Sequence, residues 1–345
     1  MAGDLTVLDL FCGCGGLSLG FEMAGFDVAL AIDNWEDALV TYRKNHKGAK
    51  TVNGDLLTLR PEEVEEKYNI HDVSVIIGGP PCQGFSVAGK RIIDDERNRL
   101  YMSFVRFVEH FQPHAFVMEN VPNILSIGEG MVREAILKDF SALGYNVKYK
   151  VLTASDYGTP QNRRRAIFVG FRDISTFEFP ERSVKEPVTT SQAISDLPEV
   201  SVDDGSNYPS TPTTEYQRMM RSGMSKLYNH QTTVHTAETQ RIIAMVPDGG
   251  NYKSLPKEMW SVRKVHIAWT RMNSQRPCFT IDTGHRHHFH YKYNRIPTVR
   301  ECARIQSFPD NFVFVGSRTS QNKQVGNAVP PLMAKAIAEQ IMKQL

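Results

Sequence analysis

The residues up to Asp33 form the pattern that most restricts the fold of this chain. An apolar run at residues 6–11 leads directly into a glycine-rich turn at residues 12–21, as in a strand followed by a turn that opens a helix. A second apolar run, residues 28–32, ends at Asp33, about twenty residues after the first glycine, where a carboxylate can bind ribose hydroxyls. Together these features predict an open α/β sheet with a nucleotide-type site at its edge.

Residues 73–86 contain the predicted nucleophile of the protein. The apolar run 73–77 is short and β-branched, which is typical of a strand covered on both faces, and it stops at two glycines. Two prolines then stiffen the loop that carries Cys82. Core cysteines usually lie inside strands and helices, whereas Cys82 follows the end of a strand, so we predict that it is a nucleophile. A free thiol has a pKa of about 8.5, so such a cysteine needs help from its surroundings to ionise.

Charged residues stand next to two further predicted strands. Glu119 follows an apolar run, and a carboxylate in that position points into the crevice where open α/β sheets bind ligands. Three consecutive arginines precede the apolar run 166–171. If a strand begins at Arg163, then Arg163 and Arg165 project from the same side of it. That alternation is compatible with Arg163 and Arg165 both pointing inward and acting as a pair.

Composition excludes several classes of protein. The 345 residues have a net charge of +2 and an ordinary apolar fraction, which predicts a folded protein able to bury a sizeable core. Five scattered cysteines indicate reduced thiols rather than a disulfide framework. No apolar run approaches the roughly 18 residues of a membrane span, and no signal-peptide pattern is visible. We therefore expect a cytoplasmic protein that does not enter a membrane.

The composition of the chain changes after about residue 186, where Pro, Ser, Thr and Tyr become frequent. This change predicts the start of a second, loop-rich domain. Residues 257–300 carry many bases and only two acids, so they are a candidate phosphate-binding surface. The histidines at residues 285–290 lack the cysteines or carboxylates that would complete a metal site, so we predict no metal. A helical pattern follows at residues 298–306, capped by Thr298.

Six short motifs stand along the chain in a fixed order. They are Leu8-Asp9-Leu10-Phe11 with Gly13, Gly15 and Gly16; Gly79-Pro80-Pro81-Cys82-Gln83; Glu119-Asn120-Val121; Gln161-x-Arg163-x-Arg165; Arg300-Glu301 to Pro309; and Gly326-Asn327-Ala328-Val329. In this order they resemble the motifs of the bacterial cytosine-C5 DNA methyltransferases. The resemblance covers nearly the whole chain apart from its middle. Asp33 departs from the family pattern, which more often has glutamate there.

The resemblance implies an α/β fold of the Rossmann-like type used by S-adenosylmethionine-dependent methyltransferases. Its mixed sheet would have helices on both faces, with a small loop-rich target-recognition domain inserted before the last elements. The implied boundaries are 1–190 and 316–345 for the catalytic and cofactor-binding domain. Residues 191–315 would form the target-recognition domain, with a hinge helix at about 298–308.

The resemblance also implies the residues of the site. The expected catalytic residues are Cys82, Glu119, Arg163 and Arg165. The residues expected to bind S-adenosylmethionine are Phe11, Gly13, Gly15, Gly16, Leu17, Asp33, Asn34, Asp55, Leu56, Pro80, Leu100, Asn327 and Ala328. Those expected to bind the substrate are Gln83, Ser86, Gln161 and Arg286.

Methylation of cytosine at C5 accounts for these residue types. C5 is too electron-poor to attack a sulfonium methyl group, so a nucleophile must first add at C6, and a thiolate suits that reversible addition. Charge then develops near N3 and O2, where Glu119 and Arg165 fit as a proton partner and a cation. C6 is inaccessible inside a duplex, so the base must be flipped out, which requires a cleft, a positive groove and a closing loop. The polar segment 90–98 is the candidate for that loop, and an ordinary surface loop is the alternative.

The expected partner is double-stranded DNA, together with a restriction endonuclease that acts on the same site. We further expect a monomer associated with the nucleoid through DNA. Two other functions stay open. Cys278-Phe279-Thr280 is similar to a triplet of tRNA cytosine-5 methyltransferases, whereas Gln83-Gly84-Phe85-Ser86 looks like the DNA-type motif. A nicotinamide-dependent oxidoreductase with a redox cysteine is the alternative from another class, but it leaves Glu119 and the arginines without a role.

Overall fold

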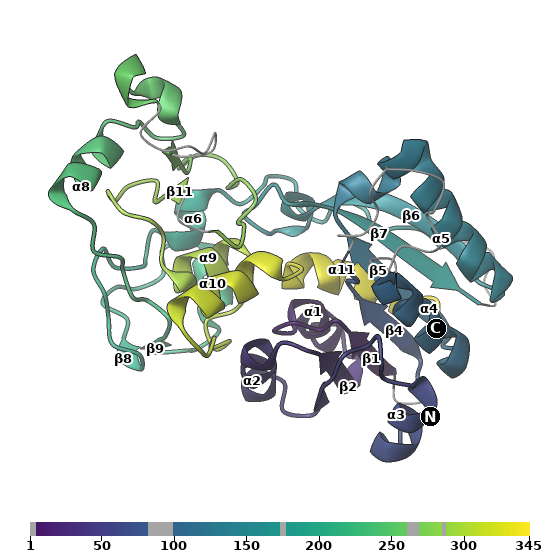
Figure 1. The fold of residues 1–345 in the computed structure, drawn as a ribbon. Helices are drawn as coiled ribbons and strands as arrows, with labels where there is room; N and C mark the ends of the chain where they lie inside the picture. The colour runs from purple at the N-terminus through teal and green to yellow at the C-terminus, as the bar shows by residue number, and fades with distance from the viewer. Residues whose placement is uncertain (1–4, 82–98, 173–176, 261–268, 285–287) are drawn as a thin grey trace. The chain divides into compact units, whose positions relative to one another are not determined.

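The computed structural model describes residues 5–81, 99–172, 177–260, 269–284 and 288–345. The chain divides into two compact units (Figure 1). The first comprises Met1–Thr153, Arg164–Glu181 and Met333–Leu345, and the second comprises Ala154–Arg163 and Arg182–Leu332. The units differ from the expected domain boundaries, because residues 154–163, 182–190 and 316–332 group with the second unit.

The first unit is built on a seven-stranded sheet with the strand order β3-β2-β1-β4-β5-β7-β6. Neighbouring strands are parallel, except that β7 runs antiparallel to both β5 and β6. Most of these strands are short apolar runs, as expected where both faces of a sheet are covered. They are β1 (Thr6–Leu10), β2 (Asp27–Asp33), β3 (Lys50–Asn53), β4 (Val75–Gly78), β5 (Ala115–Asn120), β6 (Asn146–Thr153) and β7 (Arg164–Phe171).

Alternation along the strands divides the core of this unit between the two faces of the sheet. Leu8 and Leu10 of β1 join a cluster that includes Phe104 of α4 and Phe140 of α5. On the other face, Ala31 of β2 packs with Tyr42 of α2. The helices are α1 (Gly16–Met23), α2 (Glu36–Asn45), α3 (Pro61–Tyr68), α4 (Arg99–Phe111), α5 (Met131–Ala142) and α11 (Pro331–Met342), with 3-10 turns η2 (Pro122–Leu125) and η3 (Ile127–Gly130).

The second unit consists of short elements joined by irregular backbone. Part of its core is an apolar cluster in which Ile243 of α8 packs with Trp269 and Phe289. Its helices are α6 (Thr190–Ile194), α7 (Glu215–Arg221), α8 (Ala237–Ala244), α9 (Val299–Ile305) and α10 (Arg318–Asn327), and its 3-10 turns are η4 (Ala154–Tyr157), η5 (Tyr252–Ser254) and η6 (Lys257–Met259). Its strands are β8 (Ser206–Asn207), β9 (Lys226–Leu227), β10 (Thr270–Arg271) and β11 (His288–Phe289).

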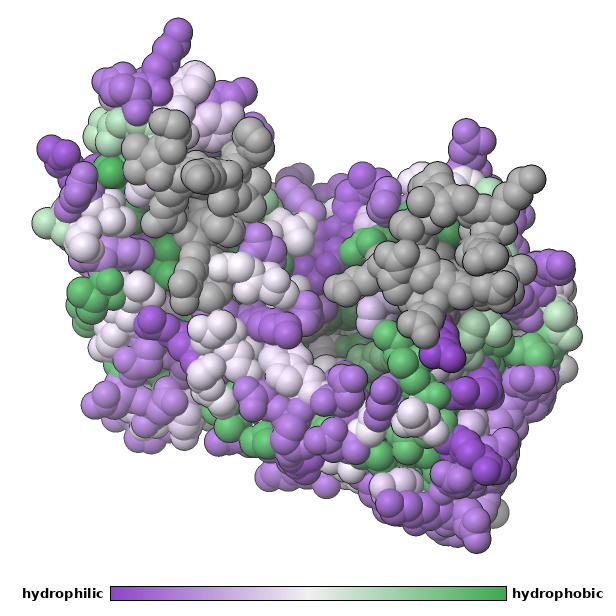
Figure 2. All heavy atoms as spheres, viewed as in Figure 1, coloured by the Kyte–Doolittle hydropathy of each residue, from purple (hydrophilic) through white to green (hydrophobic). Residues whose placement is uncertain are grey.

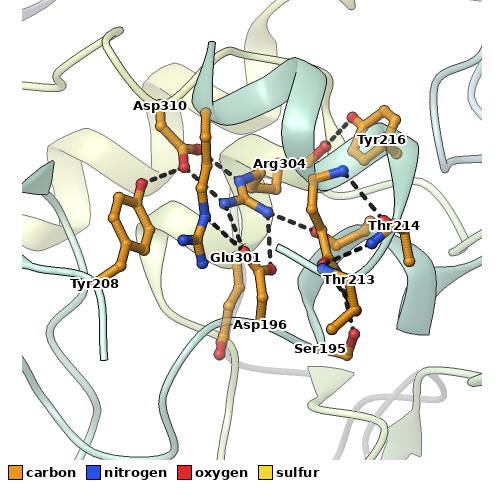
Figure 3. A network of polar contacts seen from close by, with 12 residues as sticks. Ser195, Asp196, Tyr208, Thr213, Thr214, Tyr216, Glu301, Arg304 and Asp310 are labelled. Carbon is orange, nitrogen blue, oxygen red and sulfur yellow. Dashed lines mark hydrogen bonds and ion pairs between the residues drawn. The ribbon is translucent and has the colours of Figure 1, made fainter. Parts of the chain in front are cut away.

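Helix α9 is the buried centre of the second unit. Thr298 caps it in a capping box with Glu301, which confirms the cap predicted from the sequence. The guanidinium of Arg304 is fully buried and binds Asp310 at 2.6 Å and Asp196 at 3.0 Å (Figure 3). Burial is the largest single influence on Asp310 and raises its pKa, but the charge and hydrogen bonds of Arg304, the Arg300 charge and the Tyr208 hydrogen bond together hold the pKa below its usual range. An ionic cluster therefore ties α9 to segments more than a hundred residues earlier in the chain.

Two hydroxyl groups extend this ionic cluster. Tyr208 donates to the Asp310 carboxylate, and Tyr216 of α7 donates to the main-chain oxygen of Arg304 at 2.5 Å (Figure 3). Arg221, at the end of α7, also binds Asp196. The cluster thus holds α6, α7 and the segment after α9 around one buried helix.

Hydrophilic residues predominate on the face of the molecule drawn in Figure 2, with apolar residues in small groups between them. Within the residues that the structure describes, no helix combines the length and the apolar character needed to span a bilayer.

Candidate active site

The glycine turn lies between β1 and α1, at the carboxyl edge of the sheet. Phe11, Gly13 and Gly15 adopt left-handed backbone conformations, with φ angles of 60°, 54° and 91°. Asp33, at the end of β2, accepts the N–H of Gly13 on Oδ2 and the N–H of Trp35 on Oδ1, each at 2.8 Å. Asp33 therefore braces the turn itself, and its contact with a ribose stays a prediction.

Other residues expected at the cofactor follow the neighbouring strands. Asp55 is exposed and Leu56 is buried after β3, and Asn34 is exposed after β2. Leu17 is buried in the first turn of α1, and Leu100 is half-buried at the start of α4. Because β1, β2 and β3 are parallel neighbours, the residues that follow them lie along one edge of the sheet.

The ends of β4 and β5 hold the main chain that leads to Cys82. Asn120 donates from Nδ2 to the main-chain oxygen of Pro80 at 2.9 Å. A Cβ atom at Gly79 would lie 3.0 Å from Oε2 of Glu119, so a side chain there would crowd the carboxylate, which lies close to this main chain. Cys82 itself, with Gln83, Ser86 and Arg286, lies outside the described residues.

Glu119 and Arg165 form an ion pair at this edge. Glu119 lies in β5, and Arg165 lies in the adjacent antiparallel strand β7. The Arg165 Nε atom is 2.6 Å from Oε1 of Glu119, and the two side chains are only 13% and 12% exposed. A charge-assisted contact of this length fixes the direction of the carboxylate. The pair offers a carboxyl oxygen and a cation to one planar polar group.

The four cysteines that the structure describes are all poor candidates for a nucleophile. Cys12, Cys14, Cys278 and Cys302 are buried. Burial raises the thiol pKa of each, so all four stay protonated at neutral pH. None of the cysteines that the structure describes therefore has the environment of a nucleophile.

The model of the C-5 cytosine-specific DNA methylase family matches residues 5–343. The chain belongs to this family. It is a DNA cytosine-5 methyltransferase, as its motifs predict.

Individual relatives of this DNA methylase match over its whole length. The Type II methyltransferase M1.HphI of Haemophilus parahaemolyticus is 40% identical over 343 residues, 99% of this chain and 87% of that protein. The Type II methyltransferase M.DdeI of Desulfomicrobium norvegicum is 41% identical over 369 residues, 98% of this chain and 88% of that protein.

Solved structures confirm the predicted fold class. The crystal structure of a prophage-encoded E. coli protein, described as a DNA modification methyltransferase, superposes with a TM-score of 0.83 at 28% identity. The match covers 98% of this chain and 99% of that chain. The S. pombe Dnmt2 methyltransferase has a TM-score of 0.60 at 17% identity over 99% of both chains, which shows a shared fold alone.

Strand β7 of this methylase begins at Arg164 and not at Arg163, but the expected alternation is seen in the burial, because Arg163 is buried, Arg164 is exposed and the Arg165 side chain is 13% exposed. The Arg163 guanidinium is 2% exposed and donates to the main-chain oxygens of Ile281 at 3.1 Å and Gly326 at 2.8 Å. The Ile281 oxygen belongs to irregular backbone and the Gly326 oxygen to the last turn of α10, two places where carbonyls lack regular backbone partners and a buried guanidinium can satisfy them. Arg163 therefore holds main chain in the second unit, whereas Arg165 binds Glu119.

Gln161 and Gln306 also form hydrogen bonds that hold main chain in the second unit. The fully buried Gln161 accepts the N–H of Ile281 at 2.8 Å and donates to the side-chain oxygen of Gln306. Gln306 in turn donates to the main-chain oxygens of Val325 at 3.1 Å and Ala328 at 2.7 Å. These glutamines therefore hold the segment that contains the expected cofactor residues Asn327 and Ala328. Gln306 was not among the residues predicted for the site.

The basic segment 257–300 is not one exposed surface, and the prediction is wrong for three of its arginines. Arg271, Arg295 and Arg300 are buried. Arg271 donates to main-chain oxygens of α8, Arg300 donates to those of Tyr228 and Phe312, and Arg295 binds the Glu301 carboxylate through two hydrogen bonds. Exposed bases in this segment are Lys257, Arg276 and Lys292, while Arg263, Lys264 and Arg286 lie outside the described residues.

His290 in the histidine-rich stretch shapes a turn. Its Nδ1 atom accepts the N–H groups of Lys292 and Tyr293, each at 3.0 Å. Burial lowers the pKa of His290 to about 4, so the imidazole is neutral at physiological pH. Among the described residues, no group of three metal-binding side chains converges.

Proposed function

We propose that this methylase transfers a methyl group from S-adenosylmethionine to C5 of a cytosine flipped out of a specific double-stranded DNA sequence, through a covalent bond between Cys82 and C6. The observation that carries this proposal is the Glu119–Arg165 pair, which lies against the main chain that leads to Cys82. A carboxyl group and a cation beside a nucleophile loop are what addition to a cytosine ring requires.

The glycine turn fits S-adenosylmethionine. Helix α1 begins at Gly16 without a side-chain cap, so its first N–H groups are suited to the carboxylate of the methionine part. Phe11, Asp33 and Asp55 stand where the adenosine part would be held. When bound, S-adenosylmethionine supplies an electrophilic methyl group. The remaining residues proposed to hold it are Gly13, Gly15, Leu17, Asn34, Leu56, Pro80, Leu100, Asn327 and Ala328.

The chain's own residues then divide the chemistry. The Cys82 thiolate adds to C6, and the electron pair of the C5–C6 double bond makes C5 nucleophilic. Glu119 shares a proton with N3, which accepts the charge that develops in the ring, and Arg165 stabilises O2. After methylation, the C5 hydrogen leaves as a proton and the thiolate leaves C6, which restores the double bond and the free enzyme.

Gln161, Arg163 and Gln306 have a supporting role in this proposal. Their hydrogen bonds go to main-chain groups of residues 281 and 325–328. Buried amide and guanidinium groups with satisfied partners fix a segment in one conformation. The three side chains therefore orient Asn327 and Ala328 and do not touch the reacting base.

We further propose that the enzyme protects DNA within a restriction–modification system, with an endonuclease that cuts the same site. The two relatives at about 40% identity are type II methyltransferases, which supports this setting. Membership of the C-5 cytosine-specific DNA methylase family favours DNA over tRNA as the substrate. Membership of the methylase family removes the nicotinamide oxidoreductase alternative.

Trapping on a duplex that carries 5-fluorocytosine at the target tests the covalent step. Fluorine at C5 blocks the final elimination, so the wild-type enzyme should accumulate an adduct that resists denaturation. Cys82→Ser should bind the duplex and form no adduct. Cys278→Ser is the matched control, because it removes a buried thiol, and it should trap like wild type. An adduct that survives in Cys82→Ser, or that maps to another cysteine, would refute the mechanism.

A further inference from the structure

A chain of buried polar groups lies behind the glycine turn. Tyr42 of α2 donates its hydroxyl to Ser18 Oγ of α1 at 2.7 Å. Ser18 donates in turn to Oδ2 of Asp9 in β1 at 2.5 Å. Asp9 is 1% exposed, and Ser18 and Tyr42 are fully buried. Three elements that meet under the turn are thus linked by side-chain hydrogen bonds.

His46, which follows α2, completes the layer under the turn. Its ring stacks on Tyr42 with 4.1 Å between the ring centroids, and its Nδ1 atom is 2.8 Å from Oε2 of Glu22 in α1. A carboxylate only accepts hydrogen bonds, so Nδ1 carries the hydrogen. Glu22 therefore sets the orientation of the imidazole ring.

The turn rests directly on these two rings. A Cβ atom at Gly15 would lie 2.2 Å from Nε2 of His46 and 2.8 Å from Cδ2 of Tyr42. Real Cβ atoms do not approach other atoms so closely, so His46 and Tyr42 fill the space under Gly15. Gly15 also has a φ angle of 91°, which side chains other than glycine rarely adopt. The backbone of the turn is thus defined from one side by the ring of Tyr42 in α2 and the ring of His46 just after it.

Polar groups at this place are costly compared with an apolar core. Burial raises the pKa of Asp9 to about 8, and its Oδ1 atom has no hydrogen-bond partner among the described residues. Apolar side chains of similar volume would fill the same space without this penalty. A buried polar arrangement directly under a ligand-binding turn is better explained by the shape it imposes on the turn than by stability alone.

We propose that Tyr42 and His46 are positioning residues for the methyl donor, which act by holding the Gly13–Gly16 turn in its binding conformation. The proposal rests on the proposed function, because it takes the turn as the site of S-adenosylmethionine. Neither side chain touches the cofactor. They act by preorganising the turn, so that it already has its binding conformation in the cofactor-free protein.

Tyr42→Phe tests this role, because it removes the hydroxyl bond to Ser18 and keeps the stacked ring. Calorimetry on the intact chain should show the Kd of S-adenosylmethionine rising about five- to tenfold, as for one lost hydrogen bond. The KM of S-adenosylmethionine should rise in parallel, while kcat and the KM of DNA stay within about twofold of wild type, because the reacting groups are unchanged.

Tyr145→Phe is the matched control. Tyr145 is also buried and donates its hydroxyl to the main-chain oxygen of Pro113 at 2.7 Å, but it belongs to the core on the other face of the sheet. Both variants should lower the Tm, and only Tyr42→Phe should weaken cofactor binding. Equal cofactor Kd values in wild type, Tyr42→Phe and Tyr145→Phe would overturn the proposal and leave Tyr42 a core residue.

A second pair keeps the test available if Tyr42→Phe does not fold. Ser18→Ala breaks the same hydroxyl chain, and Ser103→Ala removes a buried hydroxyl that donates to the Arg99 main-chain oxygen at 3.0 Å. Only Ser18→Ala should weaken cofactor binding, and equal Kd values would again overturn the proposal. A wild-type enzyme that binds no S-adenosylmethionine would instead refute the proposed function and this inference together.

Discussion

At the scale of single residues, the Glu119 carboxylate is held by two different constraints. Arg165 binds its Oε1 atom at 2.6 Å, and the missing side chain of Gly79 leaves room for Oε2. The carboxylate is therefore oriented before any substrate arrives. Preorganised groups of this kind stabilise a transition state without a reorganisation cost during the reaction.

We expect Glu119→Gln to slow addition of the thiolate. Glutamine keeps the size and polarity of the side chain but removes the acid proposed to share a proton with N3. Methylation and exchange of the target C5 hydrogen with solvent should both fall by roughly 10² to 10⁴, with cofactor affinity little changed. Exchange at the wild-type rate, with methylation alone lost, would place Glu119 at a later step.

Glu134→Gln provides the control for loss of a carboxylate. Glu134 forms an ion pair with Arg133 at 2.7 Å and is largely exposed, so the change removes the same kind of charge without touching the site. Both rates should stay at the wild-type level in this variant.

At the scale of elements, α9 depends on charge pairs rather than on apolar packing alone. Arg304 stands between Asp196 and Asp310, and all three side chains are fully buried. Removing Arg304 would leave Asp196 with Arg221 and Asp310 with the more distant Arg300, so both buried carboxylates would lose most of their compensation. The position of the helix therefore depends strongly on Arg304.

Arg304→Met should lower the free energy of unfolding by about 3 to 5 kcal/mol, because two buried carboxylates lose their shared cation. Urea unfolding of the intact chain measures this change. Arg43→Met is the control, since Arg43 pairs with Glu36 at an exposed site and its loss should cost less than about 1 kcal/mol. Similar losses in both variants would show that the cluster around α9 contributes no more than a surface ion pair.

At the scale of the whole molecule, the second unit is the candidate for reading the DNA sequence. Base readout needs side chains in the grooves, while phosphate contacts carry no sequence information. From the sequence, residues 191–299 would be the segment to exchange between enzymes. The structure shows that this cut separates Asp196 and Tyr208 from Arg304 and Asp310.

We expect a graft of residues 182–312 into a related methylase to transfer the recognition site, because it keeps the ionic cluster of α9 in one piece. A graft of residues 191–299 should transfer the site less effectively and lower the Tm. Bisulfite sequencing of DNA from a host that expresses each chimera identifies the methylated site. A folded 182–312 chimera that keeps the recipient's site would contradict the assignment of specificity to this unit.

Much of the catalytic unit could be predicted from local pattern. Short apolar runs ended by glycine or an acid match β1, β2, β4 and β5, and Thr298 caps α9 as expected. The location of Glu119 at a strand end also followed, because parallel strands of one sheet present their carboxyl ends to the same edge. Asn120 belongs to the Glu119-Asn120-Val121 motif, but its hydrogen bond to Pro80 could not be predicted from the motif, because it depends on β4 and β5 lying side by side.

The sequence by itself determined the type of sheet, the motif order and the family, because these depend on local periodicity and on short residue patterns. Only the tertiary structure decided which arginines are buried. Arginine is hydrophilic, so a local pattern places Arg163, Arg271 and Arg300 at the surface. Each is instead buried and donates to main-chain oxygens of another segment, namely Gly326 in the last turn of α10, Ile243 in α8 and Phe312 after α9. The partners lie far away in the chain, and no local rule records them. The contact of Tyr42 and His46 with the glycine turn is likewise a tertiary one, because it forms only when α2 packs against the turn.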